Sequence, residues 1–322
     1  MRRTLVLCAI LIVTAARSNA RAWGCDGHRA IAILAERLLS ASQLAAVRAV
    51  LLASPPDPGL ERSCPPVPAD LVAESSTWAD DQRAVEPATG PWHFINFPRT
   101  SGAAPSSHLP YCLKGGCVID AIPRQFRLAR ISTNPAVKAN AVRYLLHFVG
   151  DVHQPLHAIT NGDRGGNCLP VSYYVQAPLE EDDGNFSPNL HGVWDARTVR
   201  TLMNDKGLAD ARALAGHLAQ SQFPQSVAAV TPTIAVVKEW ASDANRLART
   251  VAYAKLPASV PIDAAAGAPL FSCDGNNHVS HRLAGLHERV DATYEQASVP
   301  AIERQLRLAG QRLAAVLKAS LP

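Results

Sequence analysis

Apolar residues recur every three to four positions in five separate stretches of this chain. This spacing places apolar side chains on one face of a helix, and Ala, Leu and Arg, which favour helices, dominate the stretches. Only residues 169–176, which include the letters VSYYV, are typical of a strand. The sequence therefore predicts a mainly α fold, with helices over residues 31–52, 118–131, 135–152, 234–254 and 301–317.

Loops rich in proline and glycine separate these stretches at residues 54–59, 64–68, 97–110 and 161–170. No low-complexity linker divides the chain and no internal repeat occurs in it. We therefore expect one compact multi-helix domain over residues 23–322, whose long loops wall a cleft.

The first 22 residues have the pattern of a secretory signal peptide. Arg2 and Arg3 precede an apolar run over residues 5–16, and small residues surround a cleavage position after Ala22. The run is too short to span a bilayer, and no later stretch reaches about 18 uninterrupted apolar residues. We expect a secreted or periplasmic protein without membrane association, whose first residue after cleavage is Trp23.

The formal net charge of +4 belongs to this leader, because residues 1–22 contain four arginines and no acid. The remaining chain is formally neutral. A general basic surface for nucleic acid or membranes is therefore not supported.

Six cysteines follow the leader, at positions 25, 64, 112, 117, 168 and 273. An even number in an exported chain favours three disulfides. Cys112 and Cys117 are the easiest pair because they close a short loop, whereas the other four cysteines allow three pairings. A cysteine-rich zinc site is the alternative, but the chain has no C-x-x-C pair at these positions.

Histidine and aspartate are densest in the stretch YLLHFVGDVHQPLH. His147 and Asp151 stand four apart and would project from one helical face, which is the geometry of metal ligands. Pro155 should end or kink the helix, so the imidazole of His157 points in another direction.

Histidine and aspartate occur in similar contexts at three further places in the chain. His191 and Asp195 repeat the four-residue spacing, while Asp80 and His93 each follow a tryptophan closely. A single such residue is more often a buried structural group. Together these imidazoles and carboxylates suit zinc better than calcium or magnesium, which prefer all-oxygen ligands.

These residues belong to a series of short motifs in a fixed order. The motifs are Trp23-Gly24, Gly27-His28, Trp78-Ala79-Asp80, Trp92-His93-Phe94-Ile95, His147-x3-Asp151-x5-His157, Asp163-x-Gly165-Gly166-Asn167 and Asn189-Leu190-His191-x2-Trp194-Asp195. The series resembles the zinc-dependent single-strand-specific nucleases, the mung bean nuclease family. It covers residues 23–195, and the region after residue 196 adds only a compatible helical pattern.

The resemblance implies a cleft with three zinc ions, in the fold shared with phospholipase C. The implied ligands of the first ion are Asp80, His93, His147 and Asp151. Those of the second are His157, His191 and Asp195. Those of the third are His28, a shared Asp151 carboxylate, and the α-amino nitrogen and carbonyl oxygen of Trp23. A free amine titrates near 8 and can lose its proton to a metal at neutral pH, which an internal peptide nitrogen cannot do.

The implied activity is metal-assisted hydrolysis of single-stranded DNA and RNA to 5′-phosphate products, with 3′-nucleotides as further substrates. Arg83 lies three residues after Asp80 and would bind the phosphate bidentately; the alternative for it is a surface ion pair. Asn96 stands where many relatives carry Asp, which puts an acid or base role in doubt and leaves a role in positioning substrate.

Two residues are candidates for binding the base. Phe94 offers a stacking surface and Asn167 a hydrogen bond to a base edge, although Phe94 as a core residue is the alternative. Duplex bases are already stacked, so such a pocket favours single strands. Tyr173 and Tyr174 are weaker candidates for stacking.

Several residues with similar chemistry are expected to be structural. His153 should pack rather than bind metal, and His278, His281 and His287 should be solvated. We expect a monomer. The nearest alternative activity is a zinc-dependent phospholipase C, and an alternative of another class is a zinc-binding protein without turnover.

Overall fold

The computed structural model of the protein describes residues 23–100, 102–181, 185–220, 223–258, 260–262, 273 and 279–321. The proposed signal peptide at residues 1–22, together with His278, lies outside the described residues.

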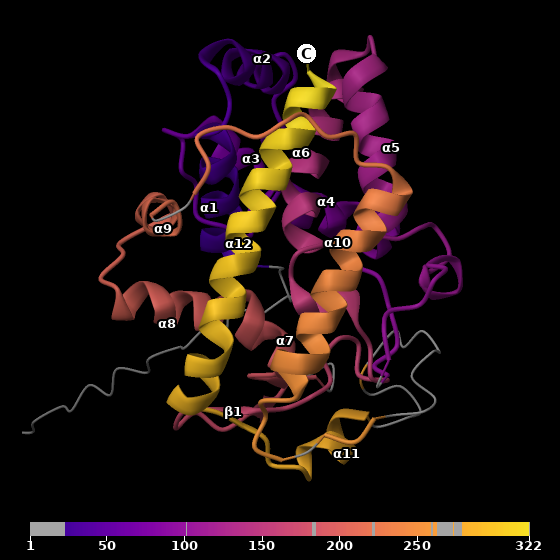
Figure 1. Cartoon of the computed structure of the whole chain (residues 1–322), viewed down its shortest axis with the longest axis vertical. Coiled ribbons are helices and arrows are strands. Elements are labelled where there is room, and N and C mark those ends of the chain that lie inside the picture. The colour runs from indigo at the N-terminus through magenta and orange to yellow at the C-terminus, as the bar shows by residue number, and fades with distance from the viewer. Residues whose placement is uncertain are drawn as a thin grey trace, which may run out of the picture.

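Five long helices build the scaffold (Figure 1). They are α1 (Gly24–Glu36), α5 (Val118–Ile131), α6 (Pro135–Asp151), α10 (Ile234–Leu247) and α12 (Ala292–Ser320). In Figure 1, α12 runs along most of the length of the molecule, with α10 beside it. Helix α1 packs against α12, and α5 against α6, around one hydrophobic core. The predicted mainly α fold is confirmed.

Shorter elements connect these helices. The α-helices are α2 (Ala41–Leu52), α3 (Leu71–Ser75), α4 (Trp78–Val85), α7 (Leu190–Gly192), α8 (Thr198–Asp205), α9 (Ala211–Leu218) and α11 (Val279–Ala284). The 3₁₀ turns are η1 (Pro87–His93), η2 (Leu109–Tyr111) and η3 (Pro155–Ala158). Two π-helical turns are η4 (Val193–Arg197) and η5 (Ala248–Tyr253).

The strands are very short. Strand β1 (Ser172–Tyr173) pairs in parallel with β4 (Arg289–Val290), and β2 (Leu179–Glu180) pairs antiparallel with β3 (Phe186–Ser187). The strand predicted over residues 169–176 is therefore mostly loop. Tyr174 ends it, because this residue adopts a left-handed φ of 53° that a strand cannot continue.

The single helix predicted over residues 31–52 is wrong, because α1 ends at Glu36 and α2 begins at Ala41. Ser40 and Gln43 form a reciprocal capping box, in which each side chain accepts the backbone N–H of the other residue. This arrangement starts a new helix.

Two other helix boundaries differ from prediction. The helix predicted over residues 234–254 passes from α10 into the π-helical η5 after Leu247. Helix α12 begins nine residues before the predicted start at residue 301, with Pro300 inside it. Its N-terminus is instead capped by Asp291, whose carboxylate accepts the N–H groups of Thr293 and Tyr294.

The described cysteines form three disulfides, Cys25–Cys64, Cys112–Cys117 and Cys168–Cys273. The expected Cys112–Cys117 pair is confirmed, and the open pairing of the other four is settled. Stable disulfides are typical of proteins in an oxidising, extracytoplasmic compartment. Among the described helices, none combines the length and apolar character needed to cross a bilayer.

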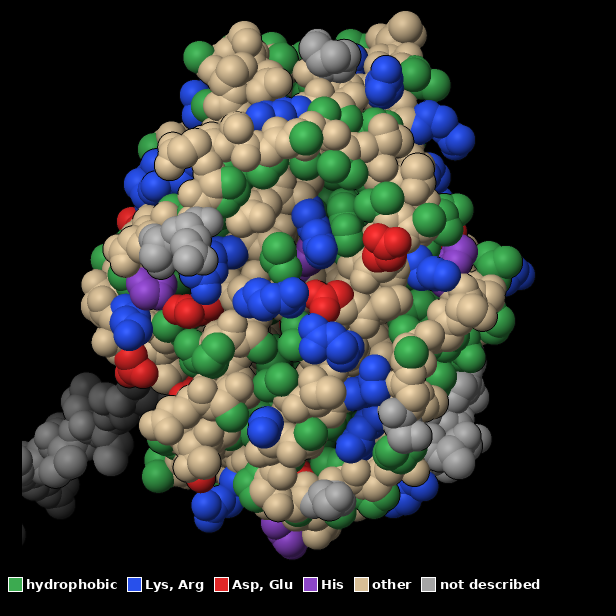
Figure 2. Space-filling view, viewed as in Figure 1, with side chains coloured by type: hydrophobic (Ala, Val, Ile, Leu, Met, Phe, Trp, Pro, Cys, Tyr) green, Lys and Arg blue, Asp and Glu red, His purple; other side chains and the backbone are tan. Residues whose placement is uncertain are grey.

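Basic side chains gather on the face formed by α10 and α12, with a few acidic side chains among them (Figure 2). Asp243 of α10 accepts ion pairs from Arg246 at 2.6 Å and from Arg304 of α12 at 3.0 Å. One carboxylate therefore offsets only part of the charge of two arginines on this face.

Candidate metal centre

Four segments of the chain meet at the C-terminal end of α6. His147 and Asp151 lie one turn apart on this helix, and both are fully buried. Helix α1 contributes His28, α4 contributes Asp80, and η1 ends at His93. These residues form two adjacent groups that could hold a metal ion, His28 with His147 and Asp151, and Asp80 with His93 and His147.

Asp151 lies between these two groups. Its Oδ1 is 3.4 Å from His28 Nε2, while its Oδ2 is 3.3 Å from His147 Nε2 and 2.9 Å from His93 Nδ1. The two oxygens of one carboxylate therefore face different histidines. This is the arrangement that a bridging ligand requires.

A separate cluster is formed by His157 of η3, His191 of α7 and Asp195 of η4. Asp195 Oδ2 is 3.3 Å from His191 Nε2, and Asp195 Oδ1 is 4.0 Å from His157 Nε2. The π-helical turn begins between the two residues from α7 and η4, and such turns occur frequently at functional sites. Pro155 begins η3 beyond the end of α6, as predicted, and His157 joins this second cluster.

Main-chain carbonyl groups orient three of the imidazoles. Nδ1 of His147 lies 2.8 Å from the Ser76 carbonyl, Nδ1 of His157 lies 2.9 Å from the His93 carbonyl, and Nδ1 of His191 lies 2.7 Å from the Gly165 carbonyl. A carbonyl oxygen only accepts, so each Nδ1 must carry the proton. Each Nε2 is left with a free lone pair, which is the tautomer that binds a metal.

Several buried atoms in these clusters make no hydrogen bond. They include His147 Nε2, Asp151 Oδ1 and Asp195 Oδ2. Buried polar groups without partners are costly, and buried charges are normally paired or bound to metals. Imidazole nitrogens and carboxylate oxygens are also the donor set of zinc. The residues present therefore fit a metal ion.

Burial lowers the pKa values of histidines in these clusters and raises those of Asp151 and Asp195. Desolvation lowers the pKa of His93 and His147, and lowers that of His191 to about 4, so these imidazoles are neutral at pH 7. Desolvation raises the pKa of Asp151 to about 8 and raises that of Asp195. Ionised carboxylates are thus unfavourable here unless a positive ion lies beside them.

Trp23 is completely buried beside this centre. Its indole Nε1 donates to the carbonyl of Gly150, the residue before Asp151, at 3.0 Å. Gly27 allows this packing, because a Cβ at that position would lie 2.6 Å from Cβ of Trp23. The indole therefore anchors the start of α1 next to Asp151.

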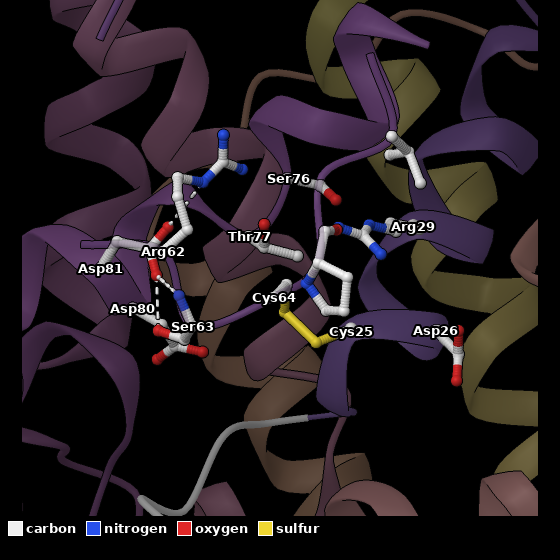
Figure 3. The surroundings of a disulfide bond; sticks show 12 residues. Cys25, Asp26, Arg29, Arg62, Ser63, Cys64, Ser76, Thr77, Asp80 and Asp81 are labelled. Carbon is white, nitrogen blue, oxygen red and sulfur yellow. Dashed lines mark hydrogen bonds and ion pairs between the residues drawn. A yellow bond between two sulfur atoms is a disulfide. The ribbon is translucent and has the colours of Figure 1, made fainter. Parts of the chain in front are cut away.

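A disulfide joins the same region to the segment before α3, and this segment in turn contacts α4 (Figure 3). Cys25 follows Trp23 closely, and its partner Cys64 belongs to the segment that precedes α3 and α4. In that segment the Ser63 N–H donates to Asp81 Oδ1 at 2.7 Å, and Arg62 pairs with Asp81 Oδ2 at 3.5 Å. Asp80, the neighbour of Asp81, is thereby held near the start of α1.

Two of the groups reach a cleft of about 590 Å³, one through Asp80 and the other through His157 and His191. This volume is typical of small-molecule sites. Its walls include the remaining predicted site residues, Arg83, Phe94, Asn96 and Asn167, together with His157 and His191.

The surroundings of these four residues bear on the roles expected for them. Phe94 and Asn96 are half-buried and line the cleft, whereas the intervening Ile95 is buried, so Phe94 is not simply a core residue. Arg83 lines the cleft and also pairs with Asp80 at 3.3 Å, so its ion pair and its access to the cleft coexist. Asn167 Nδ2 donates to the Arg164 carbonyl at 2.8 Å, which fixes its amide plane.

The residues expected to be structural lie outside the clusters. His153 is buried with Nδ1 2.6 Å from the Val149 carbonyl and Nε2 2.7 Å from the Arg312 guanidinium, and burial lowers its pKa to about 3. His281 is exposed and pairs with Glu180 at 3.1 Å, and His287 is also exposed. These predictions are confirmed for the described histidines.

The sequence did not reveal Gln154. Its buried side-chain Nε2 donates to Asp195 Oδ1 at 2.6 Å, which orients that carboxylate. Nothing in the local pattern distinguishes this glutamine from a polar residue at a helix end. A further grouping of His108, Cys112 and Asp120 is not a metal site, because the sulfur of Cys112 is bonded to Cys117.

A helical scaffold whose buried histidine and aspartate clusters lie beside a cleft with an arginine is typical of a metal-dependent hydrolase. A sequence model of the S1/P1 nuclease family matches residues 23–322. The chain belongs to that family, and is therefore an enzyme of the phosphodiesterase class.

Three relatives illustrate the similarity. Nuclease P1 of Penicillium citrinum is 28% identical over 247 residues, which cover 71% of this chain and 81% of the relative. Nuclease S1 of Aspergillus oryzae is 26% identical over 306 residues, which cover 92% and 90%. Endonuclease 2 of Arabidopsis thaliana is 28% identical over 213 residues, which cover 61% and 64%.

Family membership decides between the alternatives raised by the sequence. It favours a nuclease over a phospholipase C, and an enzyme over a zinc-binding protein without turnover. The family uses metal ions, and the His/Asp clusters are the groups able to hold them.

Proposed function

We propose that the protein is an exported, monomeric endonuclease that hydrolyses single-stranded DNA and RNA to 5′-phosphate products and also dephosphorylates 3′-nucleotides. In this proposal, residues 1–22 are removed as a signal peptide and residues 23–322 form a single nuclease domain. The observation that carries the activity is the position of Arg83 and Phe94 on one cleft with the ligand clusters.

The proposed cofactor is three zinc ions. One would be held by Asp80, His93, His147 and Asp151, one by His157, His191 and Asp195, and one by His28, Asp151 and the main-chain amine and carbonyl of Trp23. Bound zinc supplies Lewis acidity and lowers the pKa of water to about 7, which makes hydroxide available at neutral pH. Three zinc ions carry more positive charge than the aspartate ligands neutralise. Bound zinc would therefore also attract phosphate to the cleft of a formally neutral protein.

The protein's own side chains bind and orient the substrate. The planar guanidinium of Arg83 can donate two hydrogen bonds to phosphate oxygens. Phe94 lines the cleft with a half-buried ring on which a base could stack, and Asn167 offers an amide of fixed orientation to a base edge. Asn96 lies on the same wall as Phe94 and would position the nucleotide rather than transfer a proton, because an amide does not titrate.

The central test compares substrates and metal states of purified protein that begins at Trp23. Denatured DNA and RNA should be cleaved faster than duplex DNA, because a stacked duplex base cannot reach Phe94. A chelator should abolish activity and added zinc should restore it. Activity that survives complete removal of metal, or release of diacylglycerol from lecithin without nucleic-acid cleavage, contradicts the proposal.

Arg83→Lys keeps the positive charge but removes the bidentate geometry. We expect kcat to fall about 10²-fold, which is the effect of removing one donor to transition-state charge, while zinc content stays unchanged. Arg48→Lys is the matched control, because Arg48 pairs with Glu36 at 3.1 Å on an exposed surface. A variant with wild-type kcat would mean that Arg83 serves only its ion pair with Asp80.

A further inference from the structure

Tyr253 and Asp163 form a buried hydrogen bond that the proposed mechanism does not use. The Tyr253 hydroxyl donates to Asp163 Oδ2 at 2.6 Å. Tyr253 is 2% exposed and Asp163 is fully buried. The tyrosine belongs to η5, in the part of the chain where the sequence showed only helical periodicity.

Asp163 holds the glycine-rich loop over residues 161–168 in shape. Its Oδ1 accepts the Asn161 N–H at 3.1 Å, and its main-chain carbonyl accepts the Cys168 N–H at 3.0 Å. The loop also lies tightly against η3, since a Cβ at Gly165 would be 2.3 Å from the Leu156 carbonyl oxygen. The loop therefore cannot move toward η3 without a steric clash.

The loop touches both the metal cluster and the cleft. The Gly165 carbonyl accepts from His191 Nδ1 at 2.7 Å, and the Gly166 carbonyl accepts the His191 backbone N–H at 3.3 Å. Asn167, two residues beyond Gly165, lines the cleft. One loop thus sets the direction of the His191 ring and the position of the Asn167 amide.

Arg99 holds the tyrosine ring in place. Its guanidinium carbon lies 4.6 Å from the centre of the Tyr253 ring, and its Nη1 donates to the Val260 carbonyl at 2.9 Å. The Arg99 backbone N–H donates to the Thr160 carbonyl at 2.8 Å, and Thr160 also lines the cleft. Arg99 therefore links the Tyr253 ring to Thr160 of the cleft wall.

We propose that Tyr253 and Asp163 are positioning residues that, through the glycine-rich loop, set the metal-binding orientation of His191 and the base-contacting position of Asn167. The part concerning the base rests on the proposed nuclease function. The part concerning His191 depends only on metal binding.

The test removes the Tyr253 hydroxyl in the zinc-loaded protein with Tyr253→Phe. In a chelator titration followed by native mass spectrometry, the first zinc should leave at about 10-fold lower chelator concentration than in wild type. This is the lower end of the change in metal affinity seen when a group that supports a metal ligand is lost. The ratio of kcat/KM between substrates differing in one base should change about 2- to 10-fold, the size of one misplaced hydrogen bond.

Asp163→Asn should reproduce both effects, and the double variant should be no worse than the more severe single variant, because the two residues act through one hydrogen bond. Should Tyr253→Phe fail to fold, Asp163→Asn keeps the side-chain shape and carries the same zinc measurement.

The control is Tyr173→Phe, which also removes a tyrosine hydrogen bond to a carboxylate, here to Glu295 at 2.8 Å. The sequence offered Tyr173 as a stacking candidate, but the residue is not part of the cleft lining, so it is not placed to contact the base. It should release zinc and discriminate bases as the wild type does. The proposal is overturned if Tyr253→Phe lowers only the unfolding temperature and otherwise matches this control. If the wild type cleaves no nucleic acid, the proposed function fails, while the zinc titration still decides the role of Tyr253.

Discussion

Replacement of Asp151 by Asn is expected to remove nearly all nuclease activity. The two carboxylate oxygens of Asp151 face His28 on one side and His93 and His147 on the other, so the neutral amide would weaken two metal positions at once. Metal ions contribute several kcal/mol of transition-state stabilisation, and about 1.4 kcal/mol corresponds to tenfold in rate. We therefore expect kcat/KM for denatured DNA to fall about 10³-fold or more.

Metal content separates this effect from a general loss of structure. Asp195→Asn should reduce zinc only in the cluster with His157 and His191, whereas Asp151→Asn should affect the stoichiometry of two ions. Asp243→Asn is the surface control, because Asp243 pairs with Arg246 and Arg304 away from these clusters. Full zinc content and a wild-type rate in Asp151→Asn would falsify the bridging role.

A single residue added before Trp23 is expected to have the second largest effect. An added residue turns the Trp23 amine into a peptide nitrogen, which cannot serve as a neutral metal ligand at pH 7. One zinc should be lost. The loss of a group that hydrogen-bonds to a metal ligand costs about 10- to 100-fold in activity, and we expect a larger fall here because a ligand itself is lost.

The matched variant is Trp23→Ala with its free terminus kept. It removes the indole bond to the Gly150 carbonyl but leaves the main-chain atoms, so it should retain more activity and zinc than the extended protein. Zinc analysis and a nuclease assay on both forms provide the comparison. Equal activity in the extended and Trp23-initiated proteins would show that the terminal amine is not a ligand.

The sequence predicted best what local spacing encodes. The four-residue separations of His147 and Asp151 and of His191 and Asp195 place each pair on one helical face regardless of the rest of the fold. The helix over residues 118–131 was also predicted with its observed ends. The break between α1 and α2 was missed, because both helices bury a face in the same core and the apolar pattern runs through the capping box at Ser40.

The sequence by itself predicted the mainly α class and the short Cys112–Cys117 disulfide, and its resemblance to a known family supplied the candidate ligands. Only the tertiary structure decided which oxygen of Asp151 faces which histidine, which partners Cys25 and Cys168 take, and that Gln154 donates to Asp195 and Tyr253 to Asp163. Helical periodicity is a property of neighbouring residues. A contact between Asp163 and a tyrosine 90 residues later depends on how helices pack, and no local pattern records it.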